Sequence, residues 1–212
     1  AANFQQATDT LDATVSALTD TLLTNMTLTP GAGTYLLVFS DSADNSATGI
    51  QLFHNVYVNN VLVAHTERVL NAEASISANL GAMPCLIAAK VTPLAGETVA
   101  IRCRRVTNNW TVHERTLTLM KVAAADIKEA PATADEADTG IADELLGGMT
   151  ITDPGVADWL TIFSSSDRYG TITTTETATS SLYNAGVRDD NTERSMTQES
   201  SIDNADYYIF TH

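Results

Sequence analysis

The sequence predicts an all-β protein: two tandem antiparallel β-sandwiches of jelly-roll type, the second copy incomplete. The first observation is an internal repeat, because residues 22–40 recur in diverged form at 145–164. The second is a run of short apolar or alternating segments, separated by turn residues every 8 to 12 positions or so. The third is that no segment inside the repeat has a clear helical pattern. Repeats of this kind decide the domain organisation before any single element does.

The two copies align over most of the second copy's length. The offset grows by small steps, from 123 to 124 to 126 positions, so loop insertions account for it and we expect one shared topology. At the last offset His212 lies opposite Leu86, whereas the first copy continues to Val122. We therefore expect a first jelly-roll module with an N-terminal arm at 1–122, and an acidic connection followed by a partial second module at 123–212. The matched pairs are Met26-Thr27 with Met149-Thr150, Val38-Phe39-Ser40 with Ile162-Phe163-Ser164, and Thr66-Glu67-Arg68 with Thr192-Glu193-Arg194.

The first 24 residues are ambiguous. Leu11, Val15, Leu18 and Leu22 recur at helical spacing, which suits an amphipathic helix or a short coiled coil. The abundant threonines oppose a helix, because they lose side-chain freedom there. The later part of this segment aligns with the start of the second copy, so we expect it to be the first strand. Residues 1–12 are expected to be either a helical tail or, preferably, an arm that becomes ordered only in assembly.

From Met26 onward the first copy has the pattern of strands and turns. Asn59-Asn60 predicts a two-residue hairpin turn, because Asn tolerates the left-handed backbone that such turns need. At 99–104 apolar residues alternate with arginines, as in a half-buried strand. The expected elements are a turn at 30–33, a strand covered on both sides at 35–40, a loop at 41–49, a hairpin of 50–58 with 61–65, and strands at 86–91, 99–104 and 111–122, with turns at 92–96 and 108–109.

The charge is strongly negative and uneven. The formal net charge is −15, and residues 123–212 carry 17 Asp and Glu against 4 Lys and Arg. Such a surface repels phosphate, so we expect no nucleic-acid partner. Arg102, Arg104 and Arg105 come closest to a basic patch and are predicted to face an acidic partner. No apolar run reaches the ~20 residues of a membrane-spanning helix, and Ala1 does not begin a signal peptide, so no membrane association is expected.

The sequence offers few residues for chemistry. Cys85 and Cys103 lie in strand-like segments and are predicted to be buried free thiols rather than a cross-strand disulfide. Strand alternation places His65 with Glu67, and His113 with Arg115, on single faces, which would allow an acid-base site if those strands were neighbours. The second copy keeps Glu193 and Arg194 but replaces His65 by Asn191, so we favour structural ion pairs over catalysis.

No nucleophile elbow, phosphate loop, dinucleotide fingerprint, zinc pattern or calcium loop is present. We therefore predict no enzyme activity, no cofactor and no metal. Trp159 aligns with Tyr35 beside an apolar strand and is expected in a core. Trp110 follows a turn and is the better candidate for an exposed partner contact.

Three segments of the first copy, 33–40, 63–68 and 112–122, resemble jelly-roll modules of tailed-phage virion proteins such as decoration proteins, head spikes and fibres. The resemblance implies a non-enzymatic structural protein that assembles as a homotrimer and attaches to a major capsid or tail protein. It also implies a virion location after assembly in the host cytoplasm. The incomplete second copy would leave open sheet edges, which also favours assembly.

Two other functions are compatible with the sequence. A carbohydrate- or receptor-binding module of a phage fibre is the main alternative, and it would need an exposed aromatic platform around Trp110 or Tyr169. A hydrolase built on the strands of His65 and His113 is the third and weakest hypothesis.

Overall fold

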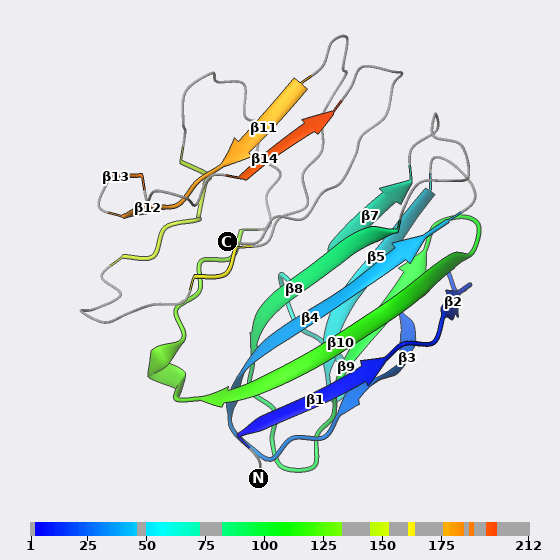
Figure 1. The fold of residues 1–212 in the computed structure, drawn as a ribbon. Coiled ribbons are helices and arrows are strands. Elements are labelled where there is room, and N and C mark those ends of the chain that lie inside the picture. The colour runs from blue at the N-terminus through cyan, green and yellow to red at the C-terminus, as the bar shows by residue number, and fades with distance from the viewer. Residues whose placement is uncertain are drawn as a thin grey trace.

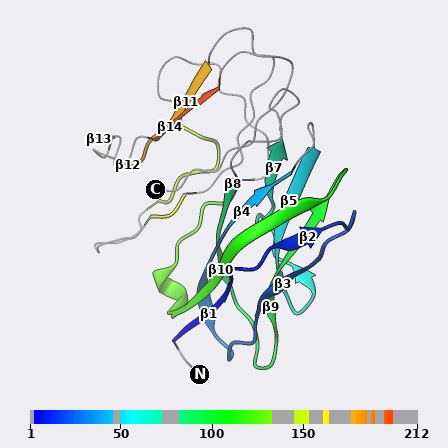
Figure 2. The same cartoon turned by 45° about the vertical axis from the view of Figure 1, so that its right-hand side comes forward.

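The computed structural model describes residues 3–45, 50–72, 82–132, 145–152, 161–163, 176–184, 187–188 and 194–198. Residues 3–122 contain two antiparallel sheets packed face to face (Figures 1 and 2). The predicted all-β sandwich is therefore confirmed. Among the described residues the single helix is a three-residue 3-10 turn, η1 (Ala124–Asp126), and no helix there has the length and apolar character to cross a membrane.

The first sheet has the strand order β1-β10-β4-β8, with the short β2 continuing the β1 edge alongside β10. These four long strands lie side by side at the front of Figure 1. The bounds are β1 (Phe4–Asp9), β2 (Ala13–Val15), β4 (Thr34–Asp44), β8 (Met83–Val91) and β10 (Trp110–Val122).

The second sheet has the order β3-β9-β5, and both β6 and β7 pair with β5 on its other side. The bounds are β3 (Thr21–Leu28), β5 (Ile50–Val58), β6 (Val61–Leu62), β7 (Arg68–Ala72) and β9 (Val99–Arg105). The chain passes from one sheet to the other after β2, β3, β4, β7, β8 and β9. The antiparallel pairs β1 with β10, β3 with β9, β4 with β8 and β5 with β7 are nested within one another. This nesting is the topology of a jelly roll.

The core forms where inward positions of the two sheets meet. Along β4 every second residue is buried from Tyr35 to Ala43, whereas the outward Leu36 and Val38 are half-buried. The prediction of a strand covered on both sides at 35–40 is thus fulfilled on one face and only partly on the other. The largest fully buried side chains are Trp110, Tyr35, Phe39, Met26, Leu37, Ile50, Leu52, Leu70, Ile87, Ile101, Leu117 and Leu119.

The N-terminal arm and its helical alternative are both wrong. Residues 4–9 form β1, which pairs with β10 from Phe4 opposite Met120 to Asp9 opposite Arg115. The amide of Lys121 also donates to the carbonyl of Asn3 at 2.7 Å. The helical spacing of leucines was misleading because Leu11, Leu18 and Leu22 are all exposed, so they do not mark a buried face. Ladder hydrogen bonds to β10 decide the structure instead, and the threonines suit a strand.

Two further boundaries differ from prediction. Residues 41–44 continue β4 instead of forming a loop, since Asp41 and Ala43 point inward in the same alternation as Phe39. The strand expected at 61–65 ends at Leu62, because the backbone of His65 has φ +64°, which no strand accommodates. The hairpin turn itself is confirmed, with φ +47° at Asn59 and +66° at Asn60.

The described part of the second half consists of two strand pairs. β11 (Glu176–Ser180) pairs with β14 (Arg194–Gln198), and β12 (Tyr183–Asn184) pairs with β13 (Val187–Arg188). When 126 is subtracted from each residue number, both pairs have the same register as strand pairs of the first copy. Glu176 opposite Gln198 corresponds to Ile50 opposite Ala72. Asn184 opposite Val187 corresponds to Val58 opposite Val61. This agreement supports the repeat over these strands. The extent of the second module remains a prediction, and Trp159 lies outside the described residues.

The turn between β9 and β10 depends on Asn108, whose φ is +54°. Substitution Asn108→Val should lower the free energy of unfolding by about 1 to 2 kcal/mol, because a β-branched residue is strained in the left-handed region. Asn108→Gly is the matched control and should be neutral or slightly stabilising, since glycine adopts this conformation without strain. Urea unfolding of the three proteins measures the difference. Equal stability of the Val and Gly variants would contradict the turn geometry.

Candidate functional site

The three arginines predicted to contact a partner lie on or at the end of β9, and each has a partner within the chain. Arg102 stacks on the Tyr57 ring, with its guanidinium carbon 4.5 Å from the ring centroid, and donates to the Asn60 side chain. The Nε of Arg105 donates to the carbonyl of Ser16 at 2.8 Å. Contact with another protein remains a prediction for these residues.

Arg104 is the centre of a polar network on the outer face of the second sheet. Its guanidinium bonds Asp20 at 3.0 Å and Glu67 at 2.8 Å, and it stacks on the ring of Phe53. Tyr57 donates its hydroxyl to Asp20 at 2.6 Å, and this hydrogen bond, with some burial, raises the pKa of Tyr57. The charge of Arg104 is therefore balanced internally. Glu67 thus has the structural ion-pairing role that the sequence led us to expect, although it lies in the connection before β7 and not on a strand.

Trp110 is not an exposed contact residue. Its side chain is fully buried, with a relative exposure of 0 %, because it is the first inward position of β10 and packs in the core. The turn that precedes Trp110 suggested an exposed side chain. The alternation of inward and outward positions along β10 instead directs the ring into the core. The carbohydrate-binding alternative thereby loses Trp110 as a platform, and Tyr169 lies outside the described residues.

The two histidines proposed for a hydrolase are not brought together. His65 lies in the turn after β6, on the second sheet's side, whereas His113 lies on β10, whose strand neighbours are β1, β2 and β4. His113 binds two carboxylates instead, with Nδ1 2.9 Å from Asp12 and Nε2 3.3 Å from Asp44. The condition for an acid-base site, that the two strands be neighbours, is not met.

His113 and Arg115 also fail to share a face, because β10 has a β-bulge between them. Val112 lies opposite Ala43 and Arg115 opposite Asp41, so β10 contains one residue more than β4 over this interval. The extra residue reverses the alternation, and Arg115 points inward while His113 points outward. Bulges have this effect on side-chain direction, and no local sequence signal marked this one.

The Arg115 guanidinium is almost completely buried and is bonded on all sides. It pairs with the Asp9 carboxylate, and it donates to the carbonyls of Leu11 at 2.7 Å, Thr24 at 3.1 Å and His113 at 3.0 Å. The Leu11 amide and the Asn25 side chain also donate to Asp9, at 2.9 and 2.8 Å. These bonds, together with the charge of Arg115, lower the pKa of Asp9.

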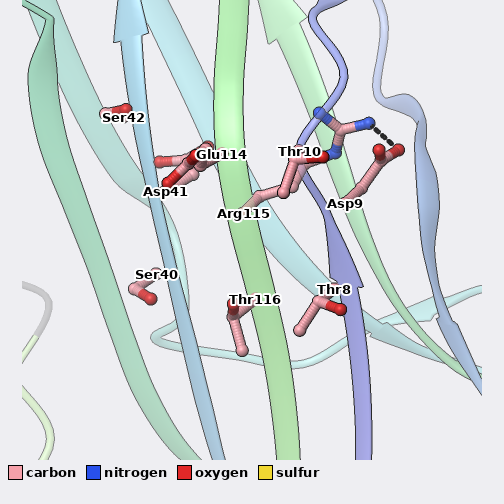
Figure 3. Close-up of a pocket in the computed structure, with 9 residues that line it drawn as sticks. All are labelled: Thr8, Asp9, Thr10, Ser40, Asp41, Ser42, Glu114, Arg115 and Thr116. Carbon is pink, nitrogen blue, oxygen red and sulfur yellow. Dashed lines mark hydrogen bonds and ion pairs between the residues drawn. The ribbon is translucent and has the colours of Figure 1, made fainter.

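A surface hollow of about 420 Å³ lies over this region, lined mainly by short hydroxyl side chains. Figure 3 shows Thr8, Ser40, Ser42 and Thr116 around it on β1, β4 and β10, with the Arg115 to Asp9 pair at one end. Because the guanidinium of Arg115 is already bonded to protein groups, the hollow offers a ligand little beyond hydroxyls and Glu114. We assign no chemistry to it.

The second buried polar group lies in the middle of the core. Asp41 on β4 and His54 on β5 face each other across the two sheets, with Oδ2 and Nε2 2.9 Å apart and both side chains without solvent exposure. Burial lowers the pKa of His54, but the charge of Asp41 and the two nearby cysteines outweighs it, so the pKa is raised well above its ordinary value. An ion pair that spans the core results.

Cys85 and Cys103 adjoin this pair. Both are free and buried, which confirms the free-thiol prediction, and burial raises the pKa of each thiol. Together with Asp41 and His54 they resemble the nucleophile, base and acid of a cysteine hydrolase. The side chains have no solvent exposure through which a substrate could reach them, so a structural or metal-binding role suits the geometry better. Asp41, His54 and Cys85 are the described residues whose ligand atoms could share a metal.

The sequence contained only a partial signal for this cluster. His54 has the parity of Leu52 and Val56, so its burial could have been predicted from the alternation of β5. Asp41 was assigned to a loop, and the four residues are far apart in the chain. Their meeting depends on how the two sheets face each other.

Comparison with known proteins adds little. No family model matches the chain, and no curated protein matches it. Similar solved structures include the infectious bursal disease virus VP2 subviral particle, at 6 % identity over 56 % of this chain and a TM-score of 0.39, and the Eiger TNF of S. frugiperda, at 14 % identity over 68 % of this chain and a TM-score of 0.39. The matched region covers 33 % of the VP2 chain and 100 % of the Eiger chain. At these values the likeness carries no information on function.

Removal of the Arg115 guanidinium should unfold the protein more easily. We expect Arg115→Met to lower the free energy of unfolding by about 3 kcal/mol or more, because the substitution removes the cation that balances Asp9 and leaves several buried carbonyls without a donor. Arg105→Met is the matched control and should cost about 1 kcal/mol, since it removes one hydrogen bond at the surface. Urea denaturation measures both. Similar losses in the two variants would show that Arg115 has no special role.

His113 should make stability depend on pH. Its pKa is raised, chiefly by the hydrogen bond to Asp12; burial lowers it, but the hydrogen bond and charge of Asp44 and the charge of Asp12 add to the raising effect. A raised pKa means that the folded state holds the proton more tightly, so the stabilisation is complete below the unfolded pKa of about 6.5 and is lost as pH rises through the folded pKa. The difference in unfolding free energy between the native protein and His113→Gln should therefore shrink from pH 6 towards alkaline pH. A constant difference would contradict this.

Proposed function

We propose that this protein is a non-enzymatic structural component of a virion, in which the jelly-roll module assembles as a homotrimer and attaches to a major capsid or tail protein. Decoration of a phage head, or a place in a head spike or fibre, is the specific role that we propose. The virion is then its location, after assembly in the host cytoplasm.

The observation that carries this proposal is the pair of open sheet edges at residues 4–28. β1 and β2 form one edge of the first sheet, and β3 forms one edge of the second, so two of the four sheet edges belong to the same stretch of chain. This stretch also exposes large apolar side chains: Phe4 at 54 %, Leu11 at 73 %, Leu18 at 64 % and Leu22 at 54 %. Edges of this kind pair with other chains unless they are protected, and oligomers of identical chains are usually closed and symmetric.

The fold and the described site agree with a structural role. Double-sheet jelly rolls are a common building block of viral capsids, although they also occur in lectins and other proteins. The buried guanidinium of Arg115 bonds Asp9 and backbone carbonyls, and the candidate acid-base residues His65 and His113 lie apart. These observations support assembly rather than catalysis as the role of this module.

The oligomeric state tests the assembly. Sedimentation equilibrium of the complete chain should give three times the 22.6 kDa mass of one chain. The double variant Leu18→Asp and Leu22→Asp places two negative charges on the open edge. It should shift the protein towards monomer, because charged side chains oppose burial of that surface. Leu94→Asp is the matched control, because Leu94 is 66 % exposed in the loop between β8 and β9, and this variant should remain trimeric. A monomeric native chain, or equal dissociation of both variants, would refute the proposed interface.

The virion location needs a separate measurement. Peptides of this chain should co-purify with density-purified virus particles produced by cells that carry its gene, in a constant ratio to the major capsid protein. Recovery of the chain only in the particle-free fraction would contradict a virion role whatever its oligomeric state.

A further inference from the structure

The core of the first module contains four side chains of the kinds that bind transition metals, and the proposed structural function uses none of them. They are arranged as two cross-strand pairs that face each other. On the first sheet Asp41 of β4 lies directly opposite Cys85 of β8, and on the second sheet His54 of β5 lies directly opposite Cys103 of β9. All four side chains are buried.

Three of the four have ligand atoms close enough to share one ion. One carboxylate oxygen of Asp41, one ring nitrogen of His54 and the sulfur of Cys85 all lie within 4.8 Å of one another. Ligands of a tetrahedral zinc ion, bound at about 2.0 to 2.3 Å, are separated by between 3 and 4 Å or so, which small side-chain rotations can reach here.

The polar atoms of this group are not satisfied by the rest of the described protein. Neither oxygen of Asp41 and neither ring nitrogen of His54 makes a hydrogen bond of good geometry within the described residues, although Oδ2 and Nε2 lie at an ion-pair distance of 2.9 Å. An ion pair uses only one of the two atoms on each side chain. Buried polar groups left in this condition are rare in proteins and call for a ligand.

The corresponding strand of the second half lacks the histidine of this cluster. β11 has the register of β5, and Ser180 takes the position that His54 has in the first copy. A strand pair of this register is thus built without the histidine, so the pairing of these strands does not require His54.

We propose that Asp41, His54 and Cys85 bind a structural Zn²⁺ ion between the two sheets, with Cys103 as the fourth ligand. The ligand set identifies the metal, because thiolate and imidazole favour zinc over magnesium and calcium, which prefer oxygen ligands. A closed, four-ligand site without an open position suits a structural role. On binding, the thiol protons and the imidazolium proton leave to solvent.

Burial determines when the ion would enter. The site has no solvent exposure in the folded chain, so zinc would be captured while the two sheets come together. The ion would then join β4 and β8 to β5 and β9, and its removal would require partial unfolding. The inference is independent of the proposed virion function, since a zinc site is compatible with any role of the module.

The test is refolding of the complete chain with and without zinc. Protein unfolded in denaturant and chelator, then refolded with excess Zn²⁺ and dialysed, should retain about one zinc per chain by elemental analysis. Its unfolding midpoint should exceed that of chain refolded in chelator, because a ligand of the folded state stabilises it. Refolding with Co²⁺ should produce the charge-transfer absorption of a cobalt-thiolate bond. Zinc-free protein with an unchanged midpoint would overturn the proposal and leave Asp41 and His54 as a bare ion pair.

Variants locate the ion. Cys85→Ala should lose the zinc and the cobalt-thiolate absorption, and Cys103→Ala should weaken both. His113→Gln is the matched control, because it removes a histidine that lies between two carboxylates, Asp12 and Asp44, outside the core, and this variant should keep the metal. Zinc lost from His113→Gln but kept by Cys85→Ala would overturn the proposal. If Cys85→Ala does not fold, the presence or absence of the cobalt-thiolate absorption in the native chain decides the question.

Discussion

The guanidinium of Arg115 bonds the backbone at three places on one side of the sandwich where the strands depart from regular geometry. One is the bulge of β10 itself, another is the break between β1 and β2 at Leu11, and the last is the irregular stretch of β3 around Thr24, where the register to β9 shifts. Each break leaves carbonyls without a ladder partner, and Arg115 donates to all three while Asp9 balances its charge. A buried arginine is costly unless its donors and charge are all satisfied, and here they are.

The same arginine contacts strands that lie at sheet edges. β1 and β2 form one edge of the first sheet and β3 one edge of the second, and Arg115 donates to the carbonyls of Leu11 and Thr24 in this stretch. The exposed leucines of this stretch lie at or near the breaks. The surface on which the proposed assembly depends therefore lies on the side of the sandwich that Arg115 stabilises.

The Asp41 to His54 pair imposes a different constraint on the centre of the core. Most inward positions are aliphatic or aromatic, and such residues tolerate exchange when volume and pattern are kept. The Asp41 to His54 pair is less tolerant, because displacement of one sheet would leave buried charges unpaired. The cluster therefore lies where the proposed metal ion would link the two sheets.

The sequence by itself determined the fold class and most strands of the first module, because turn residues and period-two alternation are local properties. It also identified the Asn59-Asn60 hairpin, the free cysteines and the ion-pairing role of Glu67. Only the tertiary structure decided the rest. Strand β1 is held by pairing with β10, which lies more than a hundred residues later in the chain. Trp110 is buried because it occupies an inward position of β10. Arg115 points inward because of a β-bulge that no local sequence pattern indicates. The meeting of Asp41, His54, Cys85 and Cys103 likewise depends on which strands become neighbours and which faces oppose, and these are long-range choices that local sequence does not contain.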